Sequence, residues 1–380
     1  MKLNFKLVLL VLTFCCSHFI TQAQYITFSH DGIDRQYIYH EPIELDENTP
    51  LVFAMHGYTG DAGSMRNYSD MNDLADLYGF AVVYPRGTKD GGGNRFWNVG
   101  YDFHPNEDVD DVGFLTELAA YLQVTHGLNP DYTFATGFSN GAEMCYMLAC
   151  QAYETFKAVA PVAGMILQDI LDECDGSTPI PLFEIHGSQD GVTPLSGDPS
   201  NQDGWGAYPS IASTIDYFVA KNECTTLVNE TLPDTDPSDD SIIVTEKHQN
   251  GINNNEVWYY EVVGGGHDWP GAWGNMDIDA GEEAWLFFRM YMDNILSNPN
   301  YNSLDKTIRV FPNPVQNMIS IENNDPTLAI QDVILYDILG VQIETSLNNG
   351  TMDLSNLSSG VYLMTINTSL GVITRRVIKE

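Results

Sequence analysis

Residues 132–150, YTFATGFSNGAEMCYMLAC, carry a serine in a pattern that can perform nucleophilic chemistry. Ser139 lies in a Gly-x-Ser-x-Gly motif, after an apolar β-type run and before a helix-type run. A nucleophile elbow has this order, because a strand stops, a sharp turn exposes the serine and a helix begins at once. Gly137 and Gly141 lack a Cβ and leave room beside the serine. The alternative is an ordinary turn before a helix, but the flanking strand and helix favour a nucleophile.

A serine nucleophile needs a base, and the base needs an acid that orients it. Residues 180–191 form an apolar strand-type run followed by a polar turn that carries Asp190. Residues 256–271 are β-rich, and a glycine hinge within them precedes His267. When the serine lies on an elbow, the acid and then the histidine follow it along the chain. We therefore expect a triad of Ser139, His267 and Asp190.

Other residues compete for the two supporting roles. Three further aspartates do not directly follow a comparable strand: Asp172, Asp175 and Asp203. Three further histidines lie in strand-like or polar stretches without a glycine hinge: His30, His40 and His248. These positions are weaker candidates for the acid and the base.

A strand-type run upstream, LVFAMHGYTG at residues 51–60, leads into a glycine-containing loop. Such a loop supplies one backbone donor to the oxyanion, and the start of the helix after the serine supplies another. We expect the N–H groups of Tyr58 and Asn140 to bind the developing oxyanion. We interpret His56 as a buried, hydrogen-bonded residue that shapes the loop.

Four tryptophans fall in loop-like segments rich in Gly, Pro, Asn and Asp: Trp97, Trp205, Trp269 and Trp273. Exposed aromatic side chains beside a catalytic loop can stack on an aromatic acyl group, a sugar ring or a polyester chain. These four tryptophans are therefore candidates for substrate binding. The alternative is that half or more of them belong to the core, since tryptophan is highly buried on average.

A series of motifs occurs in order between residues 51 and 293. They are HG at 56–57, DVGF at 111–114, GFSNG at 137–141, APVAG at 160–164, HG at 186–187 with Asp190, and GGGHDWPG at 264–271. Together they resemble the secreted polyhydroxybutyrate-depolymerase-like and feruloyl-esterase group, in carbohydrate esterase family one of the α/β-hydrolases. The resemblance implies an esterase that acts on a polymer-linked ester, without indicating which polymer.

The order of elements along the chain agrees with such a fold. Residues 25–40 alternate around Asp31-Gly32, which predicts a hairpin. From residue 51 onward, strand-type runs alternate with helix-type segments at 109–126, 141–153, 209–222 and 280–296. This alternation predicts an α/β fold with a mostly parallel sheet and helices on both faces. We expect a catalytic domain at 24–296 and a polar, turn-rich linker at 297–303.

Residues 304–380 have a different character. Short alternating runs bounded by turn residues, with no helix pattern, predict a small β-sandwich. VFPNP at 310–314, DILG at 337–340, LSSGVYL at 357–363 and the basic end at 375–379 resemble the C-terminal sorting domain of the type IX secretion system of Bacteroidetes. This resemblance implies export by that machinery. A carbohydrate-binding module is the alternative, but the tail lacks tryptophan, the usual platform for sugar rings.

The beginning of the chain predicts secretion. Residues 1–23 carry Lys2 and Lys6, an apolar run and Thr21-Gln22-Ala23, the succession of a signal peptide cleaved after residue 23. The apolar run is too short to span a membrane, and no later run approaches the necessary length. We therefore expect no transmembrane segment and an extracellular or surface-attached protein.

Four cysteines follow the expected signal peptide: Cys145, Cys150, Cys174 and Cys224. An even number in an oxidising compartment indicates disulfides, with three possible pairings. We favour Cys150 with Cys174, because one ends the elbow helix and the other lies in the loop after the next strand. Cys145 and Cys224 either pair or remain free. We expect no metal site, since Cys-x-x-Cys spacing and an accompanying histidine pair are both missing from the sequence.

The formal net charge is −36. Such an excess of acid opposes binding to nucleic acid or to an anionic membrane, and it favours neutral esters as substrates. Acidic runs at 234–236 and 239–240 lack the ordered spacing of a calcium loop, so a solvated acidic face is the preferred interpretation. The charge also suggests adaptation to salt water, where a short Debye length reduces self-repulsion.

These patterns predict a secreted serine esterase that hydrolyses feruloyl or acetyl esters of polysaccharide through an acyl-enzyme, without a cofactor. An extracellular polyhydroxybutyrate depolymerase is the first alternative. A peptidase of the same fold is disfavoured because no propeller domain precedes the hydrolase. A catalytically silent surface-binding protein is disfavoured because all three triad residues are present.

Overall fold

A computed structural model of the chain describes residues 25–42, 45–292, 308–323, 329–337, 341–343, 345–348, 350–368 and 371–379. The expected signal peptide at 1–23 and the expected linker at 297–303 lie outside the described residues. The chain divides into two compact units between Phe288 and Arg289.

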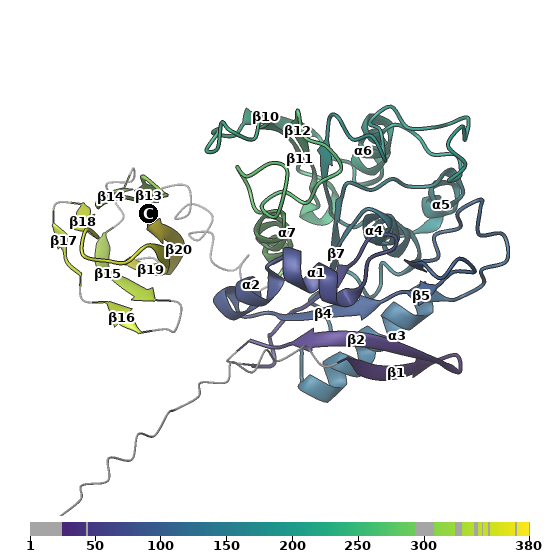
Figure 1. Cartoon of the computed structure of the whole chain (residues 1–380), viewed down its shortest axis with the longest axis horizontal. Helices are drawn as coiled ribbons and strands as arrows, with labels where there is room; N and C mark the ends of the chain where they lie inside the picture. Colours follow the sequence, from purple (N-terminus) through teal and green to yellow (C-terminus); the bar gives the residue numbers. More distant parts are fainter. Residues whose placement is uncertain are drawn as a thin grey trace, which may run out of the picture. The chain divides into compact units, whose positions relative to one another are not determined.

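The first unit consists of strands, α-helices and short 3-10 helices (Figure 1). Its strands are β1 (Ile26–His30), β2 (Ile33–His40), β3 (Leu51–Met55), β4 (Ala81–Arg86), β5 (Thr88–Lys89), β6 (Arg95–Phe96), β7 (Thr133–Phe138), β8 (Ala158–Val162), β9 (Leu182–Gly187), β10 (Thr226–Thr231), β11 (Ile242–Gln249) and β12 (Val257–Val263). Its helices are α1 (Ala62–Tyr68), α2 (Met71–Tyr78), α3 (Asp111–His126), α4 (Asn140–Gln151), α5 (Gln168–Glu173), η1 (Cys174–Gly176), α6 (Ile211–Lys221), η2 (Ile252–Asn254) and α7 (Ala280–Phe288).

Ten of these strands form one sheet in the order β1-β2-β4-β3-β7-β8-β9-β12-β11-β10, and β5 pairs with β6 separately. The six central strands, from β4 to β12, run parallel. The strands at both edges are antiparallel additions. All five residues of β3 are buried, and successive side chains of a strand point to opposite faces. Both faces of the central sheet are therefore covered, which confirms the expected α/β fold.

The ends of the helices follow from local capping. Asp110 accepts a hydrogen bond from the Gly113 N–H at 2.7 Å and starts α3, and Gly127 ends it with a left-handed φ of 69°. Helices α3, α4 and α6 match the expected segments to within two residues at each end. Helix α7 is shorter than expected and gives way to η3 (Arg289–Tyr291), and the residues from 293 onward lie outside the described part.

The predicted hairpin forms between β1 and β2. Asp31 and Gly32 at its turn have positive φ angles of 49° and 76°. Two consecutive residues in this region produce the type I′ turn that matches the twist of the flanking strands.

The second unit is built from short antiparallel strands: β13 (Ile308–Phe311), β14 (Met318–Asn323), β15 (Ile330–Asp337), β16 (Gln342–Ile343), β17 (Leu347–Asn348), β18 (Thr351–Asp353), β19 (Gly360–Thr368) and β20 (Gly371–Lys379). They form two four-stranded sheets, β13-β14-β18-β17 and β16-β15-β19-β20. Buried side chains from both sheets, among them Ile319, Leu335 and Met364, share one hydrophobic core. The described strands thus form the small β-sandwich that the sequence predicts.

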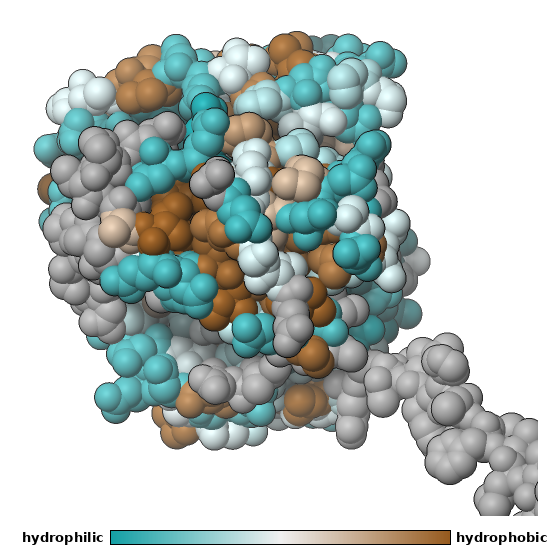
Figure 2. Space-filling model, turned by 90° about the vertical axis from the view of Figure 1, so that its left-hand side faces the viewer, coloured by the Kyte–Doolittle hydropathy of each residue, from teal (hydrophilic) through white to brown (hydrophobic). Residues whose placement is uncertain are grey.

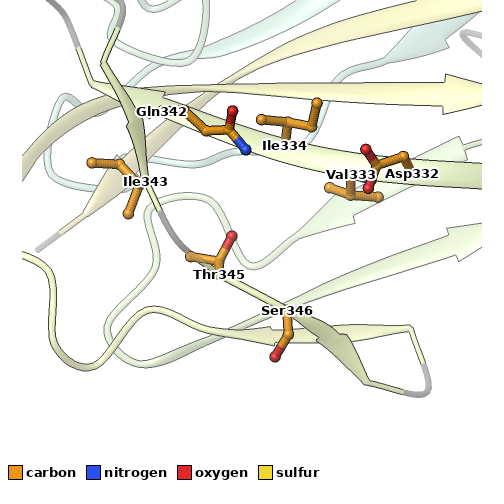
Figure 3. Close-up of a pocket in the computed structure, with 7 residues that line it drawn as sticks. All are labelled: Asp332, Val333, Ile334, Gln342, Ile343, Thr345 and Ser346. Atoms are coloured by element: carbon orange, nitrogen blue, oxygen red, sulfur yellow. The ribbon is translucent and has the colours of Figure 1, made fainter.

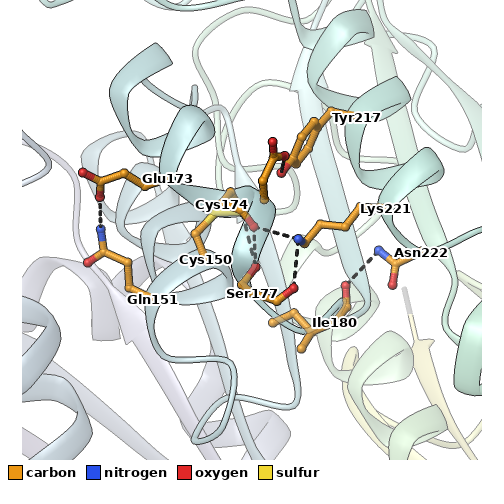
Figure 4. The surroundings of a disulfide bond; sticks show 10 residues. Cys150, Gln151, Glu173, Cys174, Ser177, Ile180, Tyr217, Lys221 and Asn222 are labelled. Carbon is orange, nitrogen blue, oxygen red and sulfur yellow. Dashed lines mark hydrogen bonds between the residues drawn. A yellow bond between two sulfur atoms is a disulfide. The ribbon is translucent and has the colours of Figure 1, made fainter.

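Cys150 at the end of α4 and Cys174 form a disulfide (Figure 4). Lys221 on α6 donates hydrogen bonds to the carbonyls of Cys174 at 2.7 Å and Ser177 at 3.0 Å. Helix η1, which the second cysteine begins, is therefore fixed to α4 and α6. Cys145 and Cys224 are free.

Hydrophilic side chains cover much of the face shown in Figure 2, and hydrophobic ones reach the surface in patches between them. No helix in the described part of the chain is long and apolar enough to cross a membrane.

Candidate active site

Ser139 lies at the junction of β7 and α4 in a strained backbone conformation, with φ 54° and ψ −120°. A non-glycine residue with positive φ is uncommon and is found where the surrounding structure enforces it. A Cβ on Gly137 would lie 2.5 Å from the backbone of Gly141, and one on Gly141 would collide with the Met55 carbonyl. Both glycines are therefore required for the close approach of β3, β7 and α4. The sharp turn is the geometry that an exposed nucleophile needs.

His267 and Asp190 meet at the same edge of the sheet. The Nδ1 atom of His267 lies 2.7 Å from the Oδ2 atom of Asp190. Asp190 follows β9, His267 follows β12, and Ser139 follows β7, so all three lie beyond the carboxyl ends of parallel strands. The ring of His267 packs against the ring of Phe138, with centroids 4.9 Å apart. The imidazole thus lies beside the residue that precedes the serine.

The carboxylate of Asp190 is buried and held by several donors. Its Oδ1 atom accepts hydrogen bonds from the N–H groups of Val192 and Thr193, both at 2.7 Å. Burial alone would raise the pKa of Asp190, but hydrogen bonds from His186 and His267 outweigh burial and hold this pKa well below its usual range. An ionised Asp190 fixes the proton of His267 on Nδ1 and leaves Nε2 as the basic nitrogen.

Tyr58 and Asn140 offer backbone donors beside the serine. A Cβ on Gly57 would lie 3.2 Å from the Cβ of Ser139, so the loop after β3 touches the elbow. Among residues 45–292, neither the N–H of Tyr58 nor that of Asn140 has a hydrogen-bond acceptor. Both groups can therefore bind an oxyanion.

His56 shapes this loop, as the sequence predicts. Its Nδ1 atom donates to the Gly57 carbonyl at 2.8 Å, and its Nε2 atom accepts from the N–H of Gly87 at 3.0 Å. Burial lowers the pKa of His56 to about 4, so the ring is neutral at pH 7. The indole of Trp97 donates to the His56 carbonyl at 2.9 Å.

Asn140 has a second function that the sequence did not indicate. Its side chain accepts from the Trp97 N–H at 2.7 Å and donates to the Trp97 carbonyl at 3.1 Å. It also contacts Glu143, whose carboxylate accepts a hydrogen bond from the Tyr101 hydroxyl. Burial raises the pKa of Glu143 to about 7. These contacts fix the start of α4 against the segment after β6.

A buried ionic chain lies behind Asp190. His186 places Nδ1 2.7 Å from Glu184, and Nε2 lies 2.7 Å from the Thr193 carbonyl and 3.4 Å from Asp190. The hydroxyl of Tyr146 donates to Glu184 at 2.9 Å. Burial opposes a charge on His186, but Asp190 and Glu184 outweigh it and raise the pKa of His186 to about 9. Sequence reasoning assigned no role to this pair, although Glu184 and His186 lie two residues apart and so share one face of β9.

Two of the four tryptophan candidates for substrate binding lie in the core, which is the alternative that the sequence left open. Trp97 and Trp269 are fully buried, because Trp97 supports His56 and Trp269 packs near Tyr68. Trp273 is 36% exposed, and Trp205 is partly buried.

Two aromatic clusters include residues near the elbow: Tyr58 in the loop that touches it, and Phe138 directly before Ser139. We name the first the loop cluster, and it consists of Tyr58, Tyr101, Phe103 and Trp205. We name the second the histidine cluster, and it consists of Tyr68, Phe138 and Trp273 around His267. Phe103 is 44% exposed and stacks on Tyr101 at 5.0 Å. Sequence reasoning missed this residue.

Open hollows are present in both units of the described chain. One of about 400 Å³ adjoins the loop cluster and is lined by residues that include Tyr101, Asp102, His104 and Met147. A larger one, of about 470 Å³, lies in the second unit between β15 and the side chains of Gln342, Ile343, Thr345 and Ser346 (Figure 3). It contains neither a histidine nor a cysteine.

Comparison with known proteins identifies the family. A family model described as "Esterase PHB depolymerase" matches residues 36–174. "Putative esterase NocK" of Nocardia uniformis is 31% identical over 240 residues, which cover 60% of this chain and 67% of that protein. The chain belongs to the PHB depolymerase esterase family. This esterase also carries a "Secretion system C-terminal sorting domain", which matches residues 309–380 and indicates an extracellular or cell-surface protein.

Other relatives of this esterase have different names. "Probable feruloyl esterase C" of Aspergillus clavatus is 32% identical over 43% of this chain and 57% of its own length. "Poly(3-hydroxyalkanoate) depolymerase C" of Paucimonas lemoignei is 27% identical over 41% of this chain and 37% of its own length. The chain thus spans less than two thirds of the length of each of these two relatives. An acetyl xylan esterase structure from Aspergillus awamori has the same fold, with a TM-score of 0.50, 17% identity and coverage of 70% of this chain and 98% of that one.

Proposed function

We propose that Ser139, His267 and Asp190 are the catalytic triad of this esterase, and that it hydrolyses feruloyl or acetyl esters of polysaccharide. The observation that supports the triad most strongly is the 2.7 Å contact between His267 Nδ1 and Asp190 Oδ2, beside a serine on a strained elbow.

The mechanism follows from these positions. The Oγ atom of Ser139 attacks the ester carbonyl while Nε2 of His267 takes its proton, and Asp190 stabilises the imidazolium. His267 then gives that proton to the departing alcohol, which leaves an acyl-enzyme. A water molecule, deprotonated by the same nitrogen, attacks the acyl carbon and releases the carboxylic acid and the free serine.

The oxyanion of each tetrahedral intermediate would be bound by the N–H groups of Tyr58 and Asn140. Both donors lie on segments that His56 and Trp97 fix by hydrogen bonds. Donors held in advance stabilise the charge without reorganisation, and each is typically worth about 10²–10³ in rate.

The surroundings of the triad support an aromatic or sugar-bearing substrate. Phe103 in the loop cluster and Trp273 in the histidine cluster are both partly exposed, so each offers a ring that a substrate can contact. Aromatic rings stack on other rings and on sugar faces. The net charge of −36 disfavours anionic substrates.

A side-by-side assay on methyl ferulate, acetylated xylan and polyhydroxybutyrate film tests this proposal. We expect turnover of ferulate or xylan acetate, and none of the three with Ser139→Ala. Clearing of the film without hydrolysis of the other two would contradict the proposed substrate. It would establish instead a polyhydroxybutyrate depolymerase, the second candidate, which the matching family model favours.

We also propose that residues 304–380 direct export through the type IX machinery. Deletion of this segment should abolish extracellular delivery in a host with that system and leave the hydrolase active. Unchanged secretion of the truncated protein would refute the proposal. Loss of polymer binding with normal secretion would indicate a binding module.

A further inference from the structure

The side chain of His30, at the end of β1, is 5% exposed, and one of its nitrogens lacks a hydrogen-bond partner. Its Nε2 atom is buried and makes no hydrogen bond to any described residue. A buried polar atom without a partner costs free energy, so an unfilled imidazole nitrogen requires an explanation.

The other nitrogen of this ring is fixed. His30 Nδ1 lies 2.8 Å from the Oε2 atom of Glu117, which is on α3. A carboxylate that accepts the Nδ1 proton sets the tautomer and leaves the lone pair on Nε2. Histidines that bind metal ions are commonly held in this way.

Two carboxylates face the free nitrogen. The Oδ2 atoms of Asp31 and Asp110 each lie 3.8 Å from His30 Nε2. One atom from each of the three residues lies within 4.8 Å of the others, and no other described residues of ligand type form such a group of three. Asp110 uses its Oδ1 atom to cap α3, so its Oδ2 atom remains available.

These separations suit a bound cation better than direct hydrogen bonds. Two ligands that are each about 2.1 Å from an ion lie between roughly 3 and 4.2 Å apart. The observed 3.8 Å falls in this range, whereas a hydrogen bond would require about 3 Å. Imidazole nitrogen with carboxylate oxygen suits zinc and similar transition ions, while Ca²⁺ and Mg²⁺ select oxygen ligands.

We propose that His30, Asp31 and Asp110 bind a divalent transition-metal ion of the Zn²⁺ type at the turn between β1 and β2. The expectation of no metal site considered cysteine spacing and paired histidines, and it did not consider residues that are distant in the sequence. The ion would connect the edge hairpin of the sheet to the first turn of α3. Its role would be structural, since His30 belongs to neither the triad nor the oxyanion loop.

Equilibrium dialysis of chelator-treated full-length protein against ZnCl₂, in buffer containing NaCl and excess Ca²⁺, tests this site. We expect one bound zinc per chain and a melting temperature that rises with Zn²⁺ but not with the same concentration of Ca²⁺. His30→Gln should weaken zinc binding at least ten-fold. Asp110→Asn should weaken it as well while preserving the helix cap, because asparagine caps as well as aspartate does.

The matched control is His126→Gln, at the other end of α3. His126 lies 3.2 Å from Glu41 and is partly exposed, an ordinary pair of histidine and carboxylate, so this variant should bind zinc like the wild type. If the protein bound no stoichiometric zinc, the proposal would be overturned. Equal zinc binding by the wild type and His30→Gln would overturn it as well, because the zinc would then be an adventitious ion on an acidic surface. If His30→Gln does not fold, Asp31→Asn and Asp110→Asn decide between the same outcomes. Hydrolysis of 4-nitrophenyl acetate should be unaffected by chelation. This assay therefore tests the proposed triad separately from zinc binding, and the failure of one proposal can be told from the failure of the other.

Discussion

The stability of the catalytic unit should decrease as the pH rises from 6.5 to 9, because the unfolded chain loses the His186 proton near pH 6.5 while the folded protein keeps it until about pH 9. His186 is fully buried between Glu184 and Asp190, and the charged ring donates to Glu184 and to the Thr193 carbonyl. When the ring loses its proton, one of these donors disappears and two buried carboxylates lose their counter-charge. This loss destabilises the turn that carries Asp190.

The magnitude follows from the shift in pKa. The pKa of His186 rises from 6.5 to about 9 on folding, and each pKa unit is worth about 1.4 kcal/mol. The folded state therefore holds the proton more tightly, which contributes about 3 kcal/mol below pH 6.5. This contribution declines as the pH rises and is lost above pH 9.

Urea unfolding at several pH values between 6 and 9.5 measures the effect. The wild type should lose about 3 kcal/mol of unfolding free energy across this range, and His186→Asn should lose much less because its side chain does not titrate. His40→Asn is the matched control, since His40 is partly exposed beside Asp76 and its variant should keep the pH dependence of the wild type. Parallel curves for the wild type and His186→Asn would show that His186 is not protonated in the folded protein.

Three further outcomes are expected. Ser139→Ala should lower ester turnover by several orders of magnitude and leave the melting temperature unchanged, and retention of more than a few per cent of activity would exclude it as the nucleophile. Replacement of Cys150 and Cys174 by alanine should lower the free energy of unfolding, measured by chemical denaturation, by about 3.5 kcal/mol. This is the loop-closure entropy expected for two cysteines 24 residues apart. Phe103→Ala should raise the KM for methyl ferulate by about two- to ten-fold while leaving turnover of 4-nitrophenyl acetate unchanged, a shift that Tyr121→Ala, at another exposed ring, should not reproduce.

The sequence predicts those features of the site that depend on neighbouring residues. The elbow could be located because its strand, its glycines and its helix are consecutive. Asp190 and His267 could be proposed because each follows a strand-type run. The hairpin turn at Asp31-Gly32 is likewise a local signal, since both residues accept positive φ.

Features that depend on packing between distant segments could not be predicted. Trp97 and Trp269 lie in loop-like sequence, but contacts with His56 and Tyr68 bury them. The exposure of Phe103 depends on how its loop packs against Trp205, about 100 residues later. The association of His30 with Glu117 spans 87 residues and becomes visible only in the folded chain.

The proposed triad residues follow the central strands of the sheet rather than its edge strands. Ser139, Asp190 and His267 all follow strands of the central parallel group, whereas the hairpin β1-β2 and the pair β10-β11 only extend its edges. Every residue of β10 is exposed. The turn between β10 and β11 is different, because the Met276 N–H, in the segment after Trp273, donates to Asp239 at 2.7 Å. The exposed side chains of β10, rather than this turn, are therefore a suitable place to attach a reporter or a surface anchor without disturbing catalysis.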